Sequence, residues 1–216
     1  MNVFAIGDVH GCVHTFKALV EKAWNTENSF LVQVGDLILK GPHSGSCIQY
    51  AMKLEKEYPY QAFFLMGNHE WLFIKEMKAD KRQERVLSVL RQTRGLGIAD
   101  DKLLDWLEKR PLVWKTPQVL ISHAGRGKKV LKPEQKDHPQ GYLMNRGPLS
   151  ALKKTQILGH IVQEQGRPLF KTSVNAWYID TGAWLGQGLT GITINDLGEV
   201  TERNYEQTHP ADLIVQ

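Results

Sequence analysis

The sequence predicts an α/β fold in which the strands of a mostly parallel sheet alternate with helices. Three short apolar runs, Val3–Ile6, Phe30–Val34 and Ala62–Met66, each end at a glycine, which is typical of buried strands. Between them, residues 14–23 and 44–54 repeat apolar side chains at helical spacing. Strands that alternate with helices in this way form βαβ units, whose strands run parallel.

The composition is that of a globular protein that does not enter a membrane. Hydrophobic residues make up 42% of the 216 residues and charged residues 23%, which excludes a disordered or collagen-like chain. No apolar run reaches the roughly 18 residues that a membrane span needs. The first strand runs directly into Gly7, so no removable leader is expected. The two cysteines, Cys12 and Cys47, are too few for a disulfide framework and predict a reduced, cytoplasmic protein.

The two helices of the first half each have one apolar face. Phe16, Leu19 and Val20 form this face in the first helix, and Ser44 is a suitable N-cap for the second. The apolar face of the second helix consists of Ile48, Ala51, Met52 and Leu54.

Residues 70–110 are predicted to be helical throughout and to form an insertion within a single domain that spans residues 1–216. Leucines at helical spacing mark two amphipathic segments, namely Leu87, Leu90 and Leu96 in the first and Leu103, Leu104 and Leu107 in the second. The acidic pair Asp100 and Asp101 suits the start of the second.

The C-terminal half is expected to consist mainly of strands, at Val119–Ile121, Ile157–Leu158, Ala176–Ile179 and Leu189–Ile194. Two packed sheets with helices on the outside would account for both halves of the chain.

Five of the predicted strands end in a segment that combines glycine with metal-binding types of side chain. These segments are Gly7-Asp8-Val9-His10-Gly11, Gly35-Asp36, Gly67-Asn68-His69-Glu70, Ser122-His123-Ala124-Gly125 and Gly159-His160. Ligands of open α/β sheets bind at the carboxyl ends of strands, so the segments should converge. Carboxylate, amide oxygen and imidazole together suit divalent metals such as Mn, Fe or Zn. Because four His and two Asp exceed one coordination sphere, we expect two metals that share a carboxylate and can bind a phosphoryl oxygen.

Taken in order, these segments resemble the signature blocks of the calcineurin-like metallophosphoesterases. Within that family they are similar to the phosphoprotein-phosphatase branch that includes bacterial diadenosine tetraphosphatase. Lys40-Gly41-Pro42, after the second block, is similar to the ApaH-like phosphatases, and Ile179-Asp180-Thr181-Gly182 resembles a later family block. The resemblance covers most of the chain and implies a four-layer α/β/β/α sandwich that hydrolyses phosphate compounds with metal-activated water.

The resemblance also implies which residues bind the metals. The ligands would be Asp8, His10, Asp36, Asn68, His123 and His160. Asp36 would bridge the two divalent ions. Manganese is the preferred metal, with Fe, Zn, Co and Mg as alternatives.

Three further residues receive roles from the same resemblance. His69 would act as a general acid or stabilise the transition state beside the leaving group, and Arg146 and Lys40 would bind the phosphate. The alternative for Arg146 and Lys40 is an ordinary surface cation. Four other histidines, His14, His43, His138 and His209, lack the strand-end glycine and are expected to be surface or capping residues.

The second block departs from the common family pattern at one position. The family usually has an acidic residue there, which orients the catalytic histidine, whereas this chain has Leu39. Without a carboxylate partner, His69 should have a lowered pKa and be a less well oriented acid. An alkoxide leaving group needs that proton more than a phosphate does, because the second pKa of a phosphate is only about 6. The substitution therefore favours phosphoanhydrides over phosphomonoesters. Lys40 keeps the charge of the usual arginine but not its bidentate geometry.

Three functions remain open at this point. The preferred one is a phosphohydrolase that acts on dinucleoside polyphosphate such as diadenosine tetraphosphate, on polyphosphate or on capped 5′ ends of RNA. The second is a Ser/Thr or Tyr protein phosphatase of the same family. The third is an inactive protein that binds phosphate ligands. The sequence does not specify the oligomeric state.

The chain has a mild positive charge, formally +4, which is consistent with an anionic substrate. Five of its cations lie in residues 126–136, against the single acid Glu134. This segment is either a solvated loop or a basic rim that guides a polyanion toward the metals. Trp71 and Tyr142 could stack a nucleobase or simply pack in the core.

Overall fold

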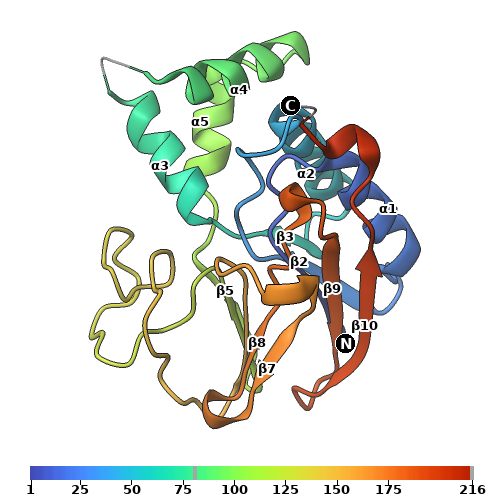
Figure 1. Cartoon of the computed structure of the whole chain (residues 1–216), viewed down its shortest axis with the longest axis vertical. Helices are drawn as coiled ribbons and strands as arrows, with labels where there is room; N and C mark the ends of the chain where they lie inside the picture. The colour runs from blue at the N-terminus through green and yellow to red at the C-terminus, as the bar shows by residue number, and fades with distance from the viewer. Residues whose placement is uncertain (80–81, 215–216) are drawn as a thin grey trace.

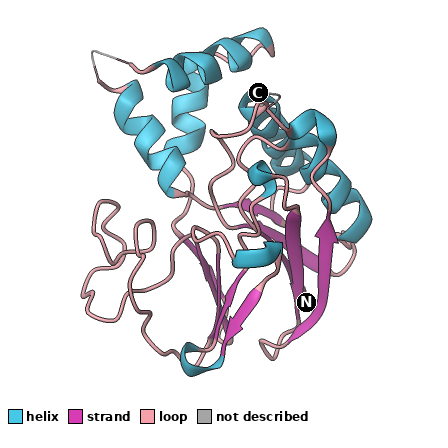
Figure 2. Ribbon diagram, viewed as in Figure 1, coloured by secondary structure: helices cyan, strands magenta, loops and turns pink. Residues whose placement is uncertain are grey.

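A computed structural model describes residues 1–79 and 82–214, and these residues form two five-stranded sheets that pack face to face (Figures 1 and 2). The strands of the first sheet lie in the order β10-β9-β1-β2-β3. Their bounds are β1 Asn2–Ile6, β2 Ser29–Gln33, β3 Ala62–Phe64, β9 Leu189–Ile194 and β10 Val200–Glu206. β1, β2 and β3 run parallel, with Phe4 opposite Leu31, whereas β9 and β10 add two antiparallel strands beside β1.

The second sheet repeats this arrangement, with three parallel strands between two antiparallel edges. Its order is β4-β5-β6-β8-β7. The bounds are β4 Val113–Lys115, β5 Val119–Ser122, β6 Thr155–Leu158, β7 Leu169–Lys171 and β8 Ala176–Tyr178. β5, β6 and β8 are parallel, and β4 and β7 are antiparallel to their neighbours. The carboxyl ends of both parallel trios therefore reach one edge of the sandwich.

All five α-helices of the described residues pack around one core on the outer face of the first sheet. They are α1 Val13–Ala23, α2 Ser44–Glu57, α3 Asn68–Met77, α4 Glu84–Gly95 and α5 Asp100–Glu108. α1 and α2 cover the sheet itself, and α3 to α5 extend beyond the strand ends (Figure 1). Short 3₁₀ turns lie at Glu164–Gly166, Thr172–Val174, Ala183–Leu185 and Pro210–Asp212.

A second core fills the space between the two sheets. Alternate residues of each strand, such as Ala5 and Val32 in the first sheet and Ile121 and Ile157 in the second, point into it and are buried. Because successive side chains of a strand point to opposite faces, the other residues of β1 and β2 face the helices. The period of two thus divides the residues of β1 and β2 between these two cores.

The α/β class and the two packed sheets are confirmed. The layer outside the second sheet differs from the expected helical layer. In the described residues no α-helix covers this face. The loop between β5 and β6 lies there instead (Figure 2), and its Leu149 packs with Leu158 and Tyr178. The layer that the resemblance implies to be helical is therefore built from loop.

Three details of the sequence analysis are wrong. Both sheets are mixed, because β9 and the edge strands run antiparallel. Ser44 is the first residue of α2, not its N-cap, and its hydroxyl accepts a hydrogen bond from the amide of Leu39. The described residues of 70–110 belong to three separate helices and the segments between them. Leu87 and Leu96 are exposed because α4 buries Val86, Val89, Leu90 and Thr93 instead.

The C-terminal segment returns to the start of α1. The buried carboxylate of Asp212 accepts hydrogen bonds from the Thr15 amide at 2.7 Å, the Thr15 hydroxyl at 2.6 Å and the His14 amide at 3.2 Å. Asp212 thus caps α1 from a distant part of the chain. No helix among the residues seen here is long and apolar enough to cross a membrane.

We expect Gly191→Ala to destabilise the first sheet. A Cβ at Gly191, in β9, would lie 2.4 Å from Cζ of the buried Phe4 ring. Such overpacking typically costs about 1–3 kcal/mol of unfolding free energy. Urea denaturation measures this loss. The matched control is Gly95→Ala at the end of α4, where a Cβ meets no atom within 4 Å. This substitution should leave stability unchanged or raise it by up to ~1 kcal/mol. Equal destabilisation by the two substitutions would contradict the packing argument.

Candidate metal centre

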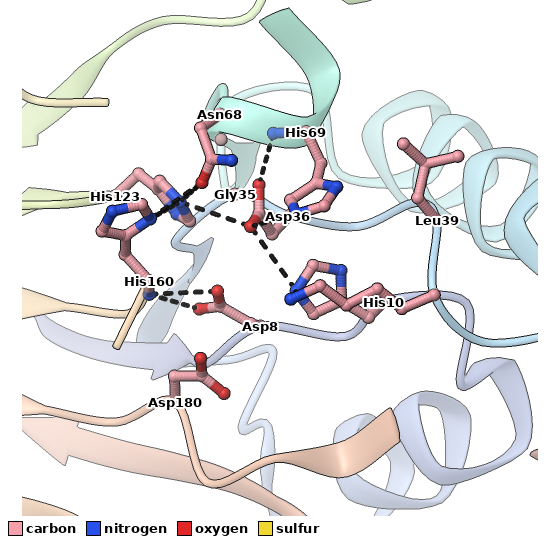
Figure 3. Close-up of polar contacts among 12 residues, drawn as sticks. Asp8, His10, Gly35, Asp36, Leu39, Asn68, His69, His123, His160 and Asp180 are labelled. Carbon is pink, nitrogen blue, oxygen red and sulfur yellow. Dashed lines mark hydrogen bonds and ion pairs between the residues drawn. The ribbon is translucent and has the colours of Figure 1, made fainter. Parts of the chain in front are cut away.

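The predicted metal ligands converge at the edge of the sandwich where the parallel strands end, with Asp36 in the middle (Figure 3). Asp36 Oδ2 lies 3.5 Å from His10 Nε2 on one side and 3.4 Å from His123 Nε2 on the other. His69 Nε2 lies 3.9 Å from the same oxygen. Asp36 therefore faces ligands from both sheets, as a bridging carboxylate would.

One group of ligands lies at the ends of β1 and β2. His10 donates its Nδ1 proton to the carbonyl of Ile38 at 3.1 Å, which leaves the Nε2 lone pair free to face Asp36. Metal-binding histidines commonly have their other nitrogen fixed in this way. The ammonium of Lys40 lies 3.1 Å from the same Nε2, so this lone pair already contacts a positive charge.

A second group of ligands joins the start of α3 to the second sheet. Asn68 Oδ1 lies 2.8 Å from both His123 Nε2 and His160 Nδ1, and the two nitrogens are 3.1 Å apart. Each of these atoms is a lone-pair donor toward a metal, and protons on two imidazoles satisfy only part of the cluster. A divalent cation would satisfy all three atoms. The residues of this group therefore fit a metal by the chemistry of their donor atoms.

Asp8 connects the two groups. Its carboxylate oxygens accept hydrogen bonds from the amide of His160 at 3.0 and 3.2 Å. A Cβ at Gly159 would lie 1.7 Å from Asp8 Oδ1, so only glycine permits the carboxylate to approach this closely.

The pKa shifts of the buried carboxylates and imidazoles are also those of a site that suits a cation. Burial raises the pKa of both Asp8 and Asp36, and neighbouring carboxylates raise each further. Burial lowers the pKa of His10 and His123 and lowers that of His160 to about 3. The imidazoles are therefore neutral near pH 7, the form that binds metal, and a cation would relieve the repulsion among the carboxylates.

His69 is adjacent to this cluster but differs from the ligands. Its amide donates a hydrogen bond to Asp36 Oδ1 at 2.9 Å, and its buried Nδ1 has no hydrogen-bond partner among the described residues. Burial, with smaller contributions from Lys40, Arg85 and Arg146, lowers its pKa to about 4. The direction is the one expected from the sequence, and burial is its main cause.

The backbone around the centre is held in unusual conformations. Five non-glycine residues have a positive φ of 47° to 67° in these loops, namely His10, Asp36, Leu39, Lys40 and His160. Such conformations cost free energy and persist only where the surroundings enforce them, which is common at functional sites. The structure therefore fixes the direction in which these side chains point.

Glu70 holds much of this backbone in place. Its buried carboxylate accepts hydrogen bonds from four amides, at 2.8 Å from Asp36 and Gly67, 2.9 Å from Leu37 and 3.2 Å from Ile38. The sequence analysis gave Glu70 no catalytic role, and this contact explains its place in the motif. It binds the loop after β2 to the start of α3.

Arg146 and Lys40 are placed differently with respect to the centre. Arg146 is exposed, makes no ion pair with a described residue, and is near enough to lower the pKa of His69 and His160. Lys40 lies between His10 and the ring of Trp184, 4.8 Å from the ring centroid.

The sequence analysis assigned no role to two further residues. Burial raises the pKa of Asp180 to about 6, and this carboxylate lies next to Asp8 (Figure 3). The signal was present, because Asp180 follows β8 and, like His123, precedes a glycine by two residues. Trp184, in contrast, lies 6.4 Å from the His10 ring without any motif to indicate it.

Other histidines and one tryptophan singled out in the sequence make contacts of their own. Three of the four histidines expected at the surface gather at the C-terminal segment, where His14 contacts both His43 and His209. Trp71 donates a hydrogen bond to Asp137 at 2.9 Å and thereby joins α3 to the loop after β5.

Glu70→Gln should destabilise the protein by about 2–4 kcal/mol. The substituted amide keeps one acceptor oxygen for four backbone donors and places an NH₂ group against others, so buried amides lose their partners. Glu202→Gln is the control, since Glu202 is exposed in β10 and should tolerate the change within about 0.5 kcal/mol. Chemical denaturation at pH 7 measures both. A Glu70→Gln protein as stable as the control would show that the four hydrogen bonds are unimportant.

Comparison with known proteins places this geometry in a family. The family described as calcineurin-like phosphoesterase matches residues 1–178. A symmetrical bis(5′-nucleosyl)-tetraphosphatase from Glaesserella parasuis is 32% identical over 133 residues, which are 58% of this chain and 45% of that protein. The chain thus spans about half the length of the curated relative that it matches.

Solved structures show the same fold. A protein described provisionally as a diadenosine tetraphosphatase superposes with a TM-score of 0.67 at 20% identity, covering 96% of this chain and 95% of the other. A protein serine/threonine phosphatase from Saccharomyces cerevisiae gives 0.66 at 13% identity, with coverages of 97% and 81%. At these identities the likeness extends to the fold alone. Because the family match takes in most of the chain, including every strand-end segment, this protein belongs to the calcineurin-like phosphoesterase family.

Proposed function

We propose that this protein is a dinuclear-metal phosphohydrolase that cleaves phosphoanhydride bonds, with dinucleoside polyphosphates as its substrates. The observation that carries the proposal is the position of Asp36 Oδ2 between two sets of ligands, 3.5 Å from His10 and 3.4 Å from His123. Membership of a phosphoesterase family supports the reaction class. The relative from Glaesserella parasuis, a tetraphosphatase by name, supports the choice of substrate.

The proposed ligands form two sets that share Asp36. Asp8 and His10 would hold the first ion with it, and Asn68, His123 and His160 would hold the second. Two divalent ions supply an activated water and a counter-charge for the phosphoryl group when bound. We prefer manganese, because a mixture of oxygen and imidazole ligands without thiolate suits it.

The remaining side chains would act on the substrate. Arg146 is exposed and unpaired among the described residues, so its guanidinium is free to bind phosphate oxygens. Lys40 would contribute a second positive charge, with its ammonium over the ring of Trp184. Asp180, next to Asp8, would keep negative charge beneath the first ion.

The state of His69 supports an anhydride as substrate. With a pKa of about 4, the imidazole is neutral near pH 7 and carries no readily donated second proton. A departing phosphate needs little protonation, whereas an alkoxide needs it strongly. The absence of a partner on His69 Nδ1 among the described residues is therefore less harmful for an anhydride than for a phosphoserine.

The proposal treats residues 1–216 as one domain with 70–110 as its helical insertion. The shared core of α3, α4 and α5 with α1 and α2 supports this view. Cys12 and Cys47 are buried and free, which suits the proposed cytoplasmic location.

A panel of substrates tests the function. With Mn²⁺ added, we expect diadenosine tetraphosphate to give the highest kcat/KM among that compound, polyphosphate, capped RNA, a phosphopeptide and an aryl phosphate. A phosphopeptide that led by tenfold or more would establish the protein phosphatase alternative instead. An absence of turnover on every compound, with metal bound, would indicate a phosphate-binding protein. As a control for the site, Asp36→Asn should lose bound metal and turnover, while Asp196→Asn, in an exposed turn, should keep both.

Leu39→Asp should shift the preference toward monoesters. A carboxylate at this position would raise the pKa of His69 from about 4 and make it a better acid. The kcat ratio of an alkyl phosphate to diadenosine tetraphosphate should rise about tenfold or more, since general acid catalysis is worth about 10²–10⁴-fold. The pH–rate profile should gain an ionisation between pH 5 and 8, above which the alkyl phosphate rate falls as His69 loses its proton.

Leu39→Asn is the matched control for this experiment. It has nearly the same shape as Asp and tolerates the positive φ of 67° equally well, but it carries no charge. An unchanged ratio in Leu39→Asp, or an equal change in Leu39→Asn, would refute the role assigned to the missing carboxylate.

A further inference from the structure

A cavity of about 640 Å³ lies beside the metal centre, on the outer face of the second sheet. Leu149, Ile161 and Tyr178 form an apolar part of its lining, and Leu169 extends this part to the rim. A volume of this size is in the range of small-molecule sites, which are mostly apolar with a few polar groups.

The charged residues that line the cavity are all positive. They are Lys128, Arg146 and Lys171, and no acidic residue lines it. Lys171 lies over the ring of Tyr178, with its ammonium 5.3 Å from the ring centroid. Lys128 and Arg146 come from the loop between β5 and β6. Within this loop the Lys128 amide donates a hydrogen bond of 2.9 Å to the Pro148 carbonyl, which holds the two parts of the loop together. The rim of the cavity therefore attracts anions.

The cavity and the metal centre share parts of the backbone. Arg146 lines the cavity and belongs to the loop between β5 and β6, which begins at His123, a proposed ligand of the second ion. Ile161 directly follows the ligand His160, and the amide of Gln163 donates a hydrogen bond to the Asp180 carbonyl at 2.8 Å. A phosphate chain that starts at the metal centre and passes Arg146 would reach Lys128 or Lys171 at the cavity rim.

The apolar lining indicates what lies at the end of such a chain. Inorganic polyphosphate would gain nothing from Leu149, Ile161 and Tyr178, whereas a nucleoside has a planar base and a sugar that can bury apolar surface. Gln163 and Ser173 add polar groups for its hydrogen bonds. We propose that this cavity binds the nucleoside end of a nucleoside polyphosphate whose far phosphoryl group lies at the metal centre. The proposal rests on the phosphohydrolase function proposed above. It adds the nucleoside as a second part of the substrate that the protein recognises, besides the phosphoryl group.

Calorimetry with two matched, non-hydrolysable ligands tests the cavity. Adenosine 5′-(α,β-methylene)diphosphate and methylenediphosphonate differ only by the nucleoside. For the Mn²⁺-loaded protein we expect the nucleotide to bind at least tenfold more tightly. Ala151→Trp places a large side chain at an exposed position of the cavity lining and should reduce this advantage at least fivefold, while methylenediphosphonate binds within twofold of the original affinity.

Lys171→Glu gives an independent measure of the rim. It should weaken the nucleotide at least fivefold, because it reverses a charge beside the phosphate chain. The control is Lys115→Glu in β4, the opposite edge strand of the same sheet, which should bind both ligands within twofold of the original protein. Thermal unfolding of each variant shows whether it is folded.

The outcomes separate the two proposals. If methylenediphosphonate binds but the nucleoside adds no affinity, the cavity proposal fails and the phosphohydrolase proposal stands. The cavity proposal also fails if the nucleotide binds tightly and neither Ala151→Trp nor Lys171→Glu weakens it. If neither ligand binds to the metal-loaded protein, the cavity proposal fails, and turnover in the substrate panel decides the phosphohydrolase proposal separately.

Discussion

The carboxylate of Glu70 is the contact on which the geometry of the centre depends. It joins four backbone amides from two loops that follow neighbouring strands, so Asp36 on one loop and Asn68 and His69 on the other keep a fixed separation. Burial raises the pKa of Glu70 above its usual value, and the four hydrogen bonds from the amides offset part of that rise by stabilising the charged form. A buried acid that contacts no substrate thus sets the position of residues that would.

The loops after β1 and β2 are attached to each other in the same manner. The amides of Val9 and His10 both donate to the carbonyl of Asp36, and the amide of Gly41 donates to the carbonyl of His10 at 2.8 Å. These contacts hold His10, Asp36 and Lys40 in left-handed conformations that the residues would not adopt alone. These backbone contacts therefore hold the side chains of the centre in place, and a centre held in this way loses less entropy on binding.

Much of the centre could be predicted from the sequence because its signal is local. A buried strand, a glycine and a polar side chain follow each other within a few residues, and topology brings such strand ends together. Features decided by distant contacts could not be predicted in this way. The edge strands β4 and β7 are only three residues long, and β7 is exposed while β4 is only partly buried, so neither gives a clear alternating pattern. The buried face of α4 depends on its packing against the other helices, which leucine spacing alone does not reveal. Trp184 reaches His10 through the fold and has no neighbouring motif.

The hydrogen bond between Asp8 and the His160 amide joins positions separated by 152 residues, and Asp180 lies beside the same carboxylate. During synthesis the chain emerges from its N-terminus, so a growing polypeptide carries Asp8, His10 and Asp36 long before the second sheet exists. The early segments cannot assemble the complete centre by themselves. Nascent chains and fragments that end before β6 and β8 therefore lack both His160 and Asp180, and they cannot form the contacts that complete the centre around Asp8.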